Sequence, residues 1–175
     1  SHAHVDHCAN SGYFQKEYGA KIALTYPEAG MCASLLNLKC YFLTLSPGTV
    51  EREASCMIHK PDLLLPVSDG PFDAWGVRFQ IVHTPGHSAG HVCTVTPDNV
   101  CYTADALLSS EMLGAKLPYN LSQQMALASR EKLRHLSCDA YIMAHRGVCS
   151  GGEIGALIDA NQALIRRRAE EILSF

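Results

Sequence analysis

The stretch Ser1-His2-Ala3-His4-Val5-Asp6-His7 opens the chain and places three histidines and one aspartate within seven residues. In an extended backbone alternate side chains share one side, so His2 and His4 are expected to point together. Asp6 and His7 are adjacent, and a turn there would direct them toward a second position. Imidazole and carboxylate ligands favour zinc, with iron or manganese as alternatives. A histidine-rich start can also be a solvated loop or a tag remnant, so the hypothesis depends on residues downstream.

Composition predicts a globular protein. The 175 residues are 47% apolar, which suits one domain, residues 1–175, with its own core. The formal charge is −3 and no basic stripe is present, which argues against a nucleic-acid partner. No apolar run approaches the roughly 20 residues of a membrane span, so no membrane partner is expected. No signal peptide is recognisable, although the chain begins inside a motif and without Met.

The eight cysteines are expected to be reduced. No two of them have C-x-x-C spacing, which argues against a cysteine zinc site. An even number could form disulfides, but several cysteines lie within apolar runs such as 92–95, which is typical of buried thiols. Reduced thiols indicate a reducing compartment, and we therefore expect a cytoplasmic protein.

Hydrophobic periodicity predicts helices and strands in both halves of the chain. The first 60 residues are expected to hold a short helix at 8–19, a strand at 21–26 and mostly helix over 28–60. Strands are then expected at 63–67, 72–75, 77–83, 92–96, 99–103 and 140–144. Asp69-Gly70 predicts a hairpin turn between the first two of these. Helices are expected at 121–136, with Ser122 as N-cap, and at 153–173. Strands and helices in this order argue for a mixed, layered α+β fold.

Three further candidate ligands each follow an apolar strand-like run. They are His87, Asp105 and His145, and each has a small residue before it. Small neighbours allow a ligand side chain to approach a metal without crowding. Together with the four residues of the opening stretch, they make seven candidate ligands.

In these seven candidate ligands and their order, the sequence resembles the metallo-β-lactamase fold superfamily. Ser-His-Ala-His-Val-Asp-His looks like its H-x-H-x-D-H motif, and Thr-Pro-Gly-His-Ser-Ala-Gly-His (84–91) looks like the next motif of glyoxalase II-like members. Asp105 and His145 match the last two ligand positions. The resemblance covers nearly the whole chain and implies a four-layer αβ/βα sandwich.

The resemblance implies a role for each ligand. His2, His4 and His87 would bind one divalent ion; Asp6, His7 and His145 would bind another; Asp105 would bridge them. The two ions, most simply Zn²⁺, would activate a hydroxide as the nucleophile. Asp6 could orient that hydroxide, so Asp6 and Asp105 are the expected catalytic residues.

The chain departs from the family pattern in two ways. The family usually has Gly before the bridging Asp and often before the last His, where this chain has Ala104 and Ala144. The family also has several strands before its first motif, and these are absent here. The domain therefore looks N-terminally truncated, and we expect either a longer protein or a homo-oligomer that forms through an open sheet edge.

The expected activity is hydrolysis of a thioester, ester or lactone-type bond of a small molecule. Arg146 is a candidate for holding a substrate carboxylate and Tyr119 for lining the rim, although both could be structural. His91 is expected to pack, or to orient its neighbours by hydrogen bonding. One alternative is a mononuclear iron oxygenase acting on persulfides through His2, His4, His87 and an Asp105-type ligand. Another is a truncated metal-binding domain without activity. A hydrolysis assay combined with oxygen consumption separates these hypotheses.

Overall fold

The computed structural model describes residues 1–114 and 118–174. The chain divides into two compact units, residues 1–67 and 68–175, and each unit is described by itself. No helix among the described residues has the length and the apolar character needed to cross a membrane. All eight cysteines are free and five of them are buried, as the sequence predicts.

The first unit consists mainly of short helices. Its elements are α1 (Val5–Cys8), α2 (Ser11–Tyr18), β1 (Ala23–Thr25), α3 (Tyr26–Met31), α4 (Leu35–Tyr41), α5 (Pro47–Ala54), the 3₁₀ turn η1 (Ser55–Met57) and β2 (Leu63–Leu65). Strands β1 and β2 pair in parallel, with Ala23 opposite Leu63.

Local sequence explains where the helices of the first unit begin and end. The side chains of Ser34 and Ser46 cap α4 and α5 by accepting backbone hydrogen bonds, and Pro47 starts α5. Gly19 ends α2 in the left-handed conformation (φ 63°). The helices enclose a small apolar core of Ala3, Cys8, Cys32, Leu38, Val50, Ala54 and Met57.

The second unit is built on a six-stranded sheet in the order β3-β4-β5-β6-β7-β8. Its elements are β3 (Gly70–Ala74), β4 (Val77–His83), β5 (Val92–Val95), β6 (Val100–Ala104), α6 (Ser110–Leu113), α7 (Gln123–Arg134), β7 (Ala140–Met143), β8 (Val148–Ser150) and α8 (Ile154–Leu173). Only β6 and β7 are parallel; the other neighbours are antiparallel.

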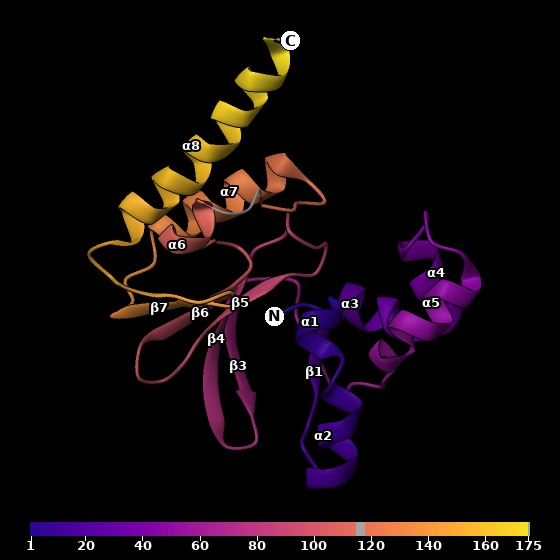
Figure 1. The fold of residues 1–175 in the computed structure, drawn as a ribbon. Helices are drawn as coiled ribbons and strands as arrows, with labels where there is room; N and C mark the ends of the chain where they lie inside the picture. The colour runs from indigo at the N-terminus through magenta and orange to yellow at the C-terminus, as the bar shows by residue number, and fades with distance from the viewer. Residues whose placement is uncertain (115–117, 175) are drawn as a thin grey trace. The chain divides into compact units, whose positions relative to one another are not determined.

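Helices cover one face of this sheet. Figure 1 shows α6, α7 and the first turns of α8 beside the strands, while the last turns of α8 extend beyond them. The buried residues of α8 accordingly lie between Ile154 and Leu164. The core between helices and sheet includes Val82, Cys93, Cys101, Leu107, Leu133, Tyr141, Met143, Leu157 and Ile158.

Most expected elements are confirmed to within a few residues. Strand β4 has the predicted bounds, and Ser122 caps α7 by accepting the Met125 N–H. The hairpin turn predicted at Asp69-Gly70 is wrong, because β2 pairs with β1 and not with β3. The hairpin instead joins β3 to β4 at Trp75-Gly76, where both residues have positive φ (49° and 81°). The strand at 148–150 and the helix at 110–113 were not expected, being too short to show periodicity.

The open edges of the six-stranded sheet lie at β3 and β8. The apolar strands β4 and β5 both have a neighbour on either side; β4 pairs with β3 over 77–81 and with β5 over 80–83. On the edge strand β8, Val148 is 67% exposed. Self-association through an open edge therefore stays a prediction that concerns β3 and β8.

Candidate metal centre

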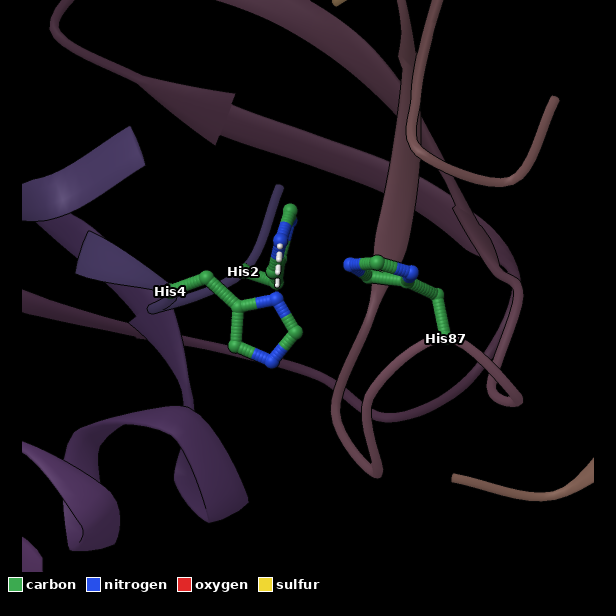
Figure 2. A group of neighbouring side chains, drawn as sticks. All are labelled: His2, His4 and His87. Atoms are coloured by element: carbon green, nitrogen blue, oxygen red, sulfur yellow. Dashed lines mark hydrogen bonds between the residues drawn. The ribbon is translucent and has the colours of Figure 1, made fainter. Parts of the chain in front are cut away.

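In the first unit His2 and His4 lie side by side, as the alternation of an extended backbone predicts. Their ring centroids are 4.5 Å apart, and Nε2 of His2 lies 3.1 Å from Nδ1 of His4 (Figure 2). His4 has extended backbone angles and is the N-cap residue of α1. His2 is buried, with 2% of its surface exposed.

Asp6 and His7 belong to α1, so the chain turns into a helix directly after His4. The His7 ring centroid lies 4.1 Å from that of His2, and Nε2 of His7 lies 3.8 Å from a carboxylate oxygen of Asp6. The Asp6 side chain is 52% exposed. The four candidate ligands of the opening stretch therefore form one cluster.

Two residues that sequence reasoning missed hold this stretch in place. The buried carboxylate of Glu28, on α3, accepts the backbone N–H of Ala3 at 2.8 Å. The hydroxyl of Tyr41, on α4, lies 2.5 Å from Nε2 of His4. No local pattern marks either residue, because each contact spans many positions in the chain. Their effect is to fix the backbone between His2 and His4 and the plane of the His4 ring.

The second unit brings its three candidate ligands together. Nε2 of His87 lies 3.2 Å from Oδ2 of Asp105, and Nε2 of His145 lies 3.4 Å from Oδ1. The Asp105 side chain is buried (7% exposed), and those of His87 and His145 are 11% and 36% exposed. Asp105 follows β6 and His145 lies just after β7. Because β6 and β7 are parallel neighbours, their carboxyl ends lie side by side.

The loop that carries His87 is held by close packing and by a backbone contact. Nδ1 of His87 donates to the carbonyl of Tyr119 at 2.9 Å, which leaves Nε2 as the ligand nitrogen. Gly86 has φ 139°, and a Cβ there would collide with the backbone of Ala126 on α7. Only glycine allows this loop to lie so close to α7.

His91 has the orienting position that the sequence suggested. It is fully buried, its Nδ1 lies 2.8 Å from Oγ1 of Thr84, and its ring centroid lies 6.0 Å from that of His87. His83, at the end of β4, is also partly buried, and this desolvation lowers its pKa. Both histidines therefore belong to the packing around the His87 loop.

Two buried polar side chains that sequence reasoning missed hold the loop after Asp105. Nε of Arg130 donates to the carbonyl of Ala106 at 3.0 Å, and burial lowers the pKa of this guanidinium to about 10. Asn161 is fully buried and pairs with both the N–H and the C=O of Leu108, each at 2.9 Å. Asn161 is among the buried residues of α8.

The backbone conformation at Ala104 is one that favours glycine, the residue the family usually has before the bridging aspartate. Ala104 has φ 46°, in the left-handed region that favours glycine. Ala144, before His145, is not among the residues with positive φ. Ala104 therefore carries backbone strain next to the candidate ligand Asp105, whereas Ala144 carries none next to His145.

Arg146 and Tyr119, the candidate substrate residues, each lie next to a candidate metal ligand. Arg146 follows His145 with φ 64°, and its 80% exposed guanidinium lies 3.4 Å from Glu111. The Tyr119 ring is 56% exposed, with its centroid 5.7 Å from that of His87. The ion pair of Arg146 with Glu111 is solvent-exposed, so it contributes little to stability.

The donor atoms of each cluster fit divalent metal ions. Neutral imidazoles and carboxylates are ligands of zinc, iron and manganese. In the second unit, two imidazole nitrogens already flank the two oxygens of one buried carboxylate. A carboxylate with a ring nitrogen at each oxygen has the chemistry of a ligand that bridges two ions.

Comparison with known proteins identifies the family. The family model for the metallo-beta-lactamase superfamily matches residues 1–145. The chain is 30% identical over 130 residues to a hydroxyacylglutathione hydrolase of Ruegeria pomeroyi, covering 72% of this chain and 49% of that protein. It is 28% identical over 103 residues to a hydroxyacylglutathione hydrolase of Rhizobium meliloti, covering 58% of this chain and 39% of that one.

Solved structures share the fold. A metallo-beta-lactamase family protein from Thermus thermophilus aligns with a TM-score of 0.72 and 22% identity, covering 99% of this chain and 61% of that one. An archaeal superfamily protein from Sulfolobus tokodaii aligns with a TM-score of 0.62 and 16% identity, covering 97% and 75% of the two chains. The present chain thus spans about half the length, or less, of the curated relatives it matches. The predicted α+β metallo-β-lactamase fold is confirmed, and the chain belongs to the metallo-beta-lactamase superfamily.

Proposed function

We propose that the protein is a dinuclear metal hydrolase that cleaves a thioester or related acyl bond of a small molecule. One ion would be held by His2, His4 and His87, the other by Asp6, His7 and His145, and Asp105 would bridge the two. The observation that carries this proposal is the pair of contacts, 3.2 Å and 3.4 Å, from the buried Asp105 carboxylate to His87 and His145.

The chain's own residues prepare the site for this chemistry. A pair of bound ions would supply an activated water and a positive charge to polarise the scissile carbonyl. Asp105 is buried, and its carboxylate would oppose the positive charge of the ions. Asp6, half exposed at the start of α1, would orient the attacking hydroxide. The Tyr119 carbonyl keeps the His87 ring in one orientation.

The substrate class follows from the relatives and from Arg146. Both curated relatives are hydroxyacylglutathione hydrolases, and a hydroxyacylglutathione is a thioester whose peptide part carries carboxylates. Arg146 has a strained backbone beside His145, and strain of this kind is concentrated at functional sites. We assign it to a substrate carboxylate, with Tyr119 at the rim. Arg146→Ala should then raise KM for an anionic thioester with little change in kcat.

Zinc is the metal we expect, and the reduced cysteines favour a cytoplasmic location. The decisive experiment supplies the purified chain with Zn²⁺, Mn²⁺ or Fe²⁺ and measures bound metal, thiol release from a hydroxyacylglutathione and oxygen uptake with a persulfide. We expect two ions per chain at the histidine and aspartate ligands named above, and thiol release without oxygen uptake. Oxygen uptake with a single iron would instead identify the oxygenase alternative, and metal binding without any turnover a non-catalytic domain.

A further inference from the structure

Three side chains of the first unit that the proposed hydrolase does not use gather in its core. The sulfurs of Cys8 and Cys32 and one ring nitrogen of His59 all lie within 4.8 Å of one another. They come from the end of α1, the residue after α3 and the segment after η1. Cys8 and Cys32 are 2% and 0% exposed, and His59 is 9% exposed.

The environment of His59 points to a ligand. Its Nδ1 lies 2.7 Å from the backbone carbonyl of Met57, which holds that nitrogen as the donor. Its Nε2 is buried and has no hydrogen-bond partner among the described residues. A buried polar atom without a hydrogen-bond partner destabilises the folded state, so its retention needs an explanation. A histidine whose Nδ1–H is fixed by a carbonyl presents the Nε2 lone pair, as metal-binding histidines do.

We propose that Cys8, Cys32 and His59 form a second, separate metal site for a thiophilic divalent cation such as Zn²⁺. Zinc bonds of about 2.3 Å to sulfur and about 2.0 Å to nitrogen place tetrahedral ligand atoms roughly 3.5–3.8 Å apart. The three atoms therefore need to move together by about 1 Å at most. Two thiolates and one divalent ion form a neutral unit, which an apolar core accepts more readily than two bare thiolates.

The site would be structural and would support the candidate ligands beside it. Cys8 directly follows His7, so a cation on its sulfur ties α1 to α3 and to the segment after η1. The sequence alone argued against a cysteine site, because no two cysteines have C-x-x-C spacing. Their contact is a product of the fold of the first unit.

Cobalt spectroscopy distinguishes this site from the catalytic centre. Co²⁺ bound to thiolate gives a sulfur-to-metal charge-transfer band in the near ultraviolet, whereas histidine and carboxylate ligands do not. We would add Co²⁺ to the reduced, metal-free chain and to three variants. We expect the band in the wild type, in Asp105→Asn and in Cys40→Ser, whose thiol is exposed, with one thiolate-bound cobalt per chain. Cys32→Ser should lose it.

The wild-type result tests the proposal even if Cys32→Ser fails to fold. Absence of the band in reduced wild-type protein would overturn it, and so would a band that survives in Cys32→Ser. A disulfide between Cys8 and Cys32 in protein purified under reducing conditions would also overturn it. A band that survives in Asp105→Asn supports the site even if the hydrolase proposal is wrong, so the two can fail separately.

Discussion

Nε2 of His87 lies 3.2 Å from Oδ2 of Asp105, although two whole strands, β5 and β6, separate these residues in the chain. His91 lies four residues after His87 in the chain, but its Nδ1 lies 2.8 Å from Oγ1 of Thr84 and its ring centroid is 6.0 Å from that of His87. We therefore propose Asp105 as a metal ligand and His91 as a residue that supports one.

Asp105→Ala should therefore lower kcat/KM more than His91→Ala. Removal of the bridging carboxylate is expected to abolish binding of at least one ion, whereas loss of a supporting group typically costs about 10–100-fold. Metal content by elemental analysis and thiol release from a thioester measure both effects. Equal losses in metal and in activity would contradict this distinction.

Removal of metal should lower the melting temperature. The ligands bind the ions only when folded, so an ion at a concentration 100 times its Kd stabilises the native state by about 2.7 kcal/mol. Calorimetry of the loaded and the chelated chain tests this, with the chelated chain reloaded as the control. If melting temperature and metal content were both unchanged by chelation, the ligand assignment would be wrong.

Ala104→Gly should destabilise the protein less than Ala144→Gly. Both variants lose a methyl group and take on the backbone-entropy cost of glycine, about 0.5–1 kcal/mol. Ala104 has φ 46°, which costs an L-residue about 1 kcal/mol that glycine relieves, whereas Ala144 has no such strain to relieve. Urea unfolding of the metal-free variants gives both values. A larger loss for Ala104→Gly would argue against strain at this position.

Asn161→Ala should destabilise the second unit by about 2–4 kcal/mol, because it leaves both backbone groups of Leu108 without their partner. The loop after Asp105 should loosen as well, so activity should fall with stability. The control is Asp159→Ala, which breaks an exposed 2.7 Å ion pair with Arg134 and should cost at most about 1 kcal/mol. Urea unfolding compares the two variants, and similar costs would show that Asn161 does not anchor the loop.

Asp62 should make the stability of the first unit depend on pH in acid. The Ile22 N–H, then Gln15 and Lys21, lower the pKa of Asp62 from 3.8 to about 2. Because the folded pKa is the lower one, this contribution is present above pH 3.8 and is lost as the pH falls toward 2. In metal-free protein, Asp62→Asn should weaken the pH dependence across this window. Urea unfolding of the wild type and of Asp62→Asn across this window measures the effect, and an unchanged pH dependence would contradict the prediction.

The sequence by itself determined the residue types and the order of the candidate metal ligands, and most of the helices and strands. Alternation placed His2 beside His4, periodicity predicted β4 with its observed bounds, and the composition of two short motifs indicated the superfamily. These features are local. The strand period of two residues, the helix period of 3.6 residues and the spacing of a motif can all be recognised within a short stretch of sequence. For the same reason Ser122 was recognisable as a helix cap.

Only the tertiary structure decided which distant side chains meet. The contacts of Glu28 with Ala3, of Asn161 with Leu108, and of Cys8 with Cys32 and His59 join residues that no local pattern connects. The pairing of β2 with β1 depends on such contacts too, which is why the turn signal at Asp69-Gly70 misled. Burial selects these partners: each polar group removed from water needs a neighbour, and the fold of the whole unit decides which one is in reach.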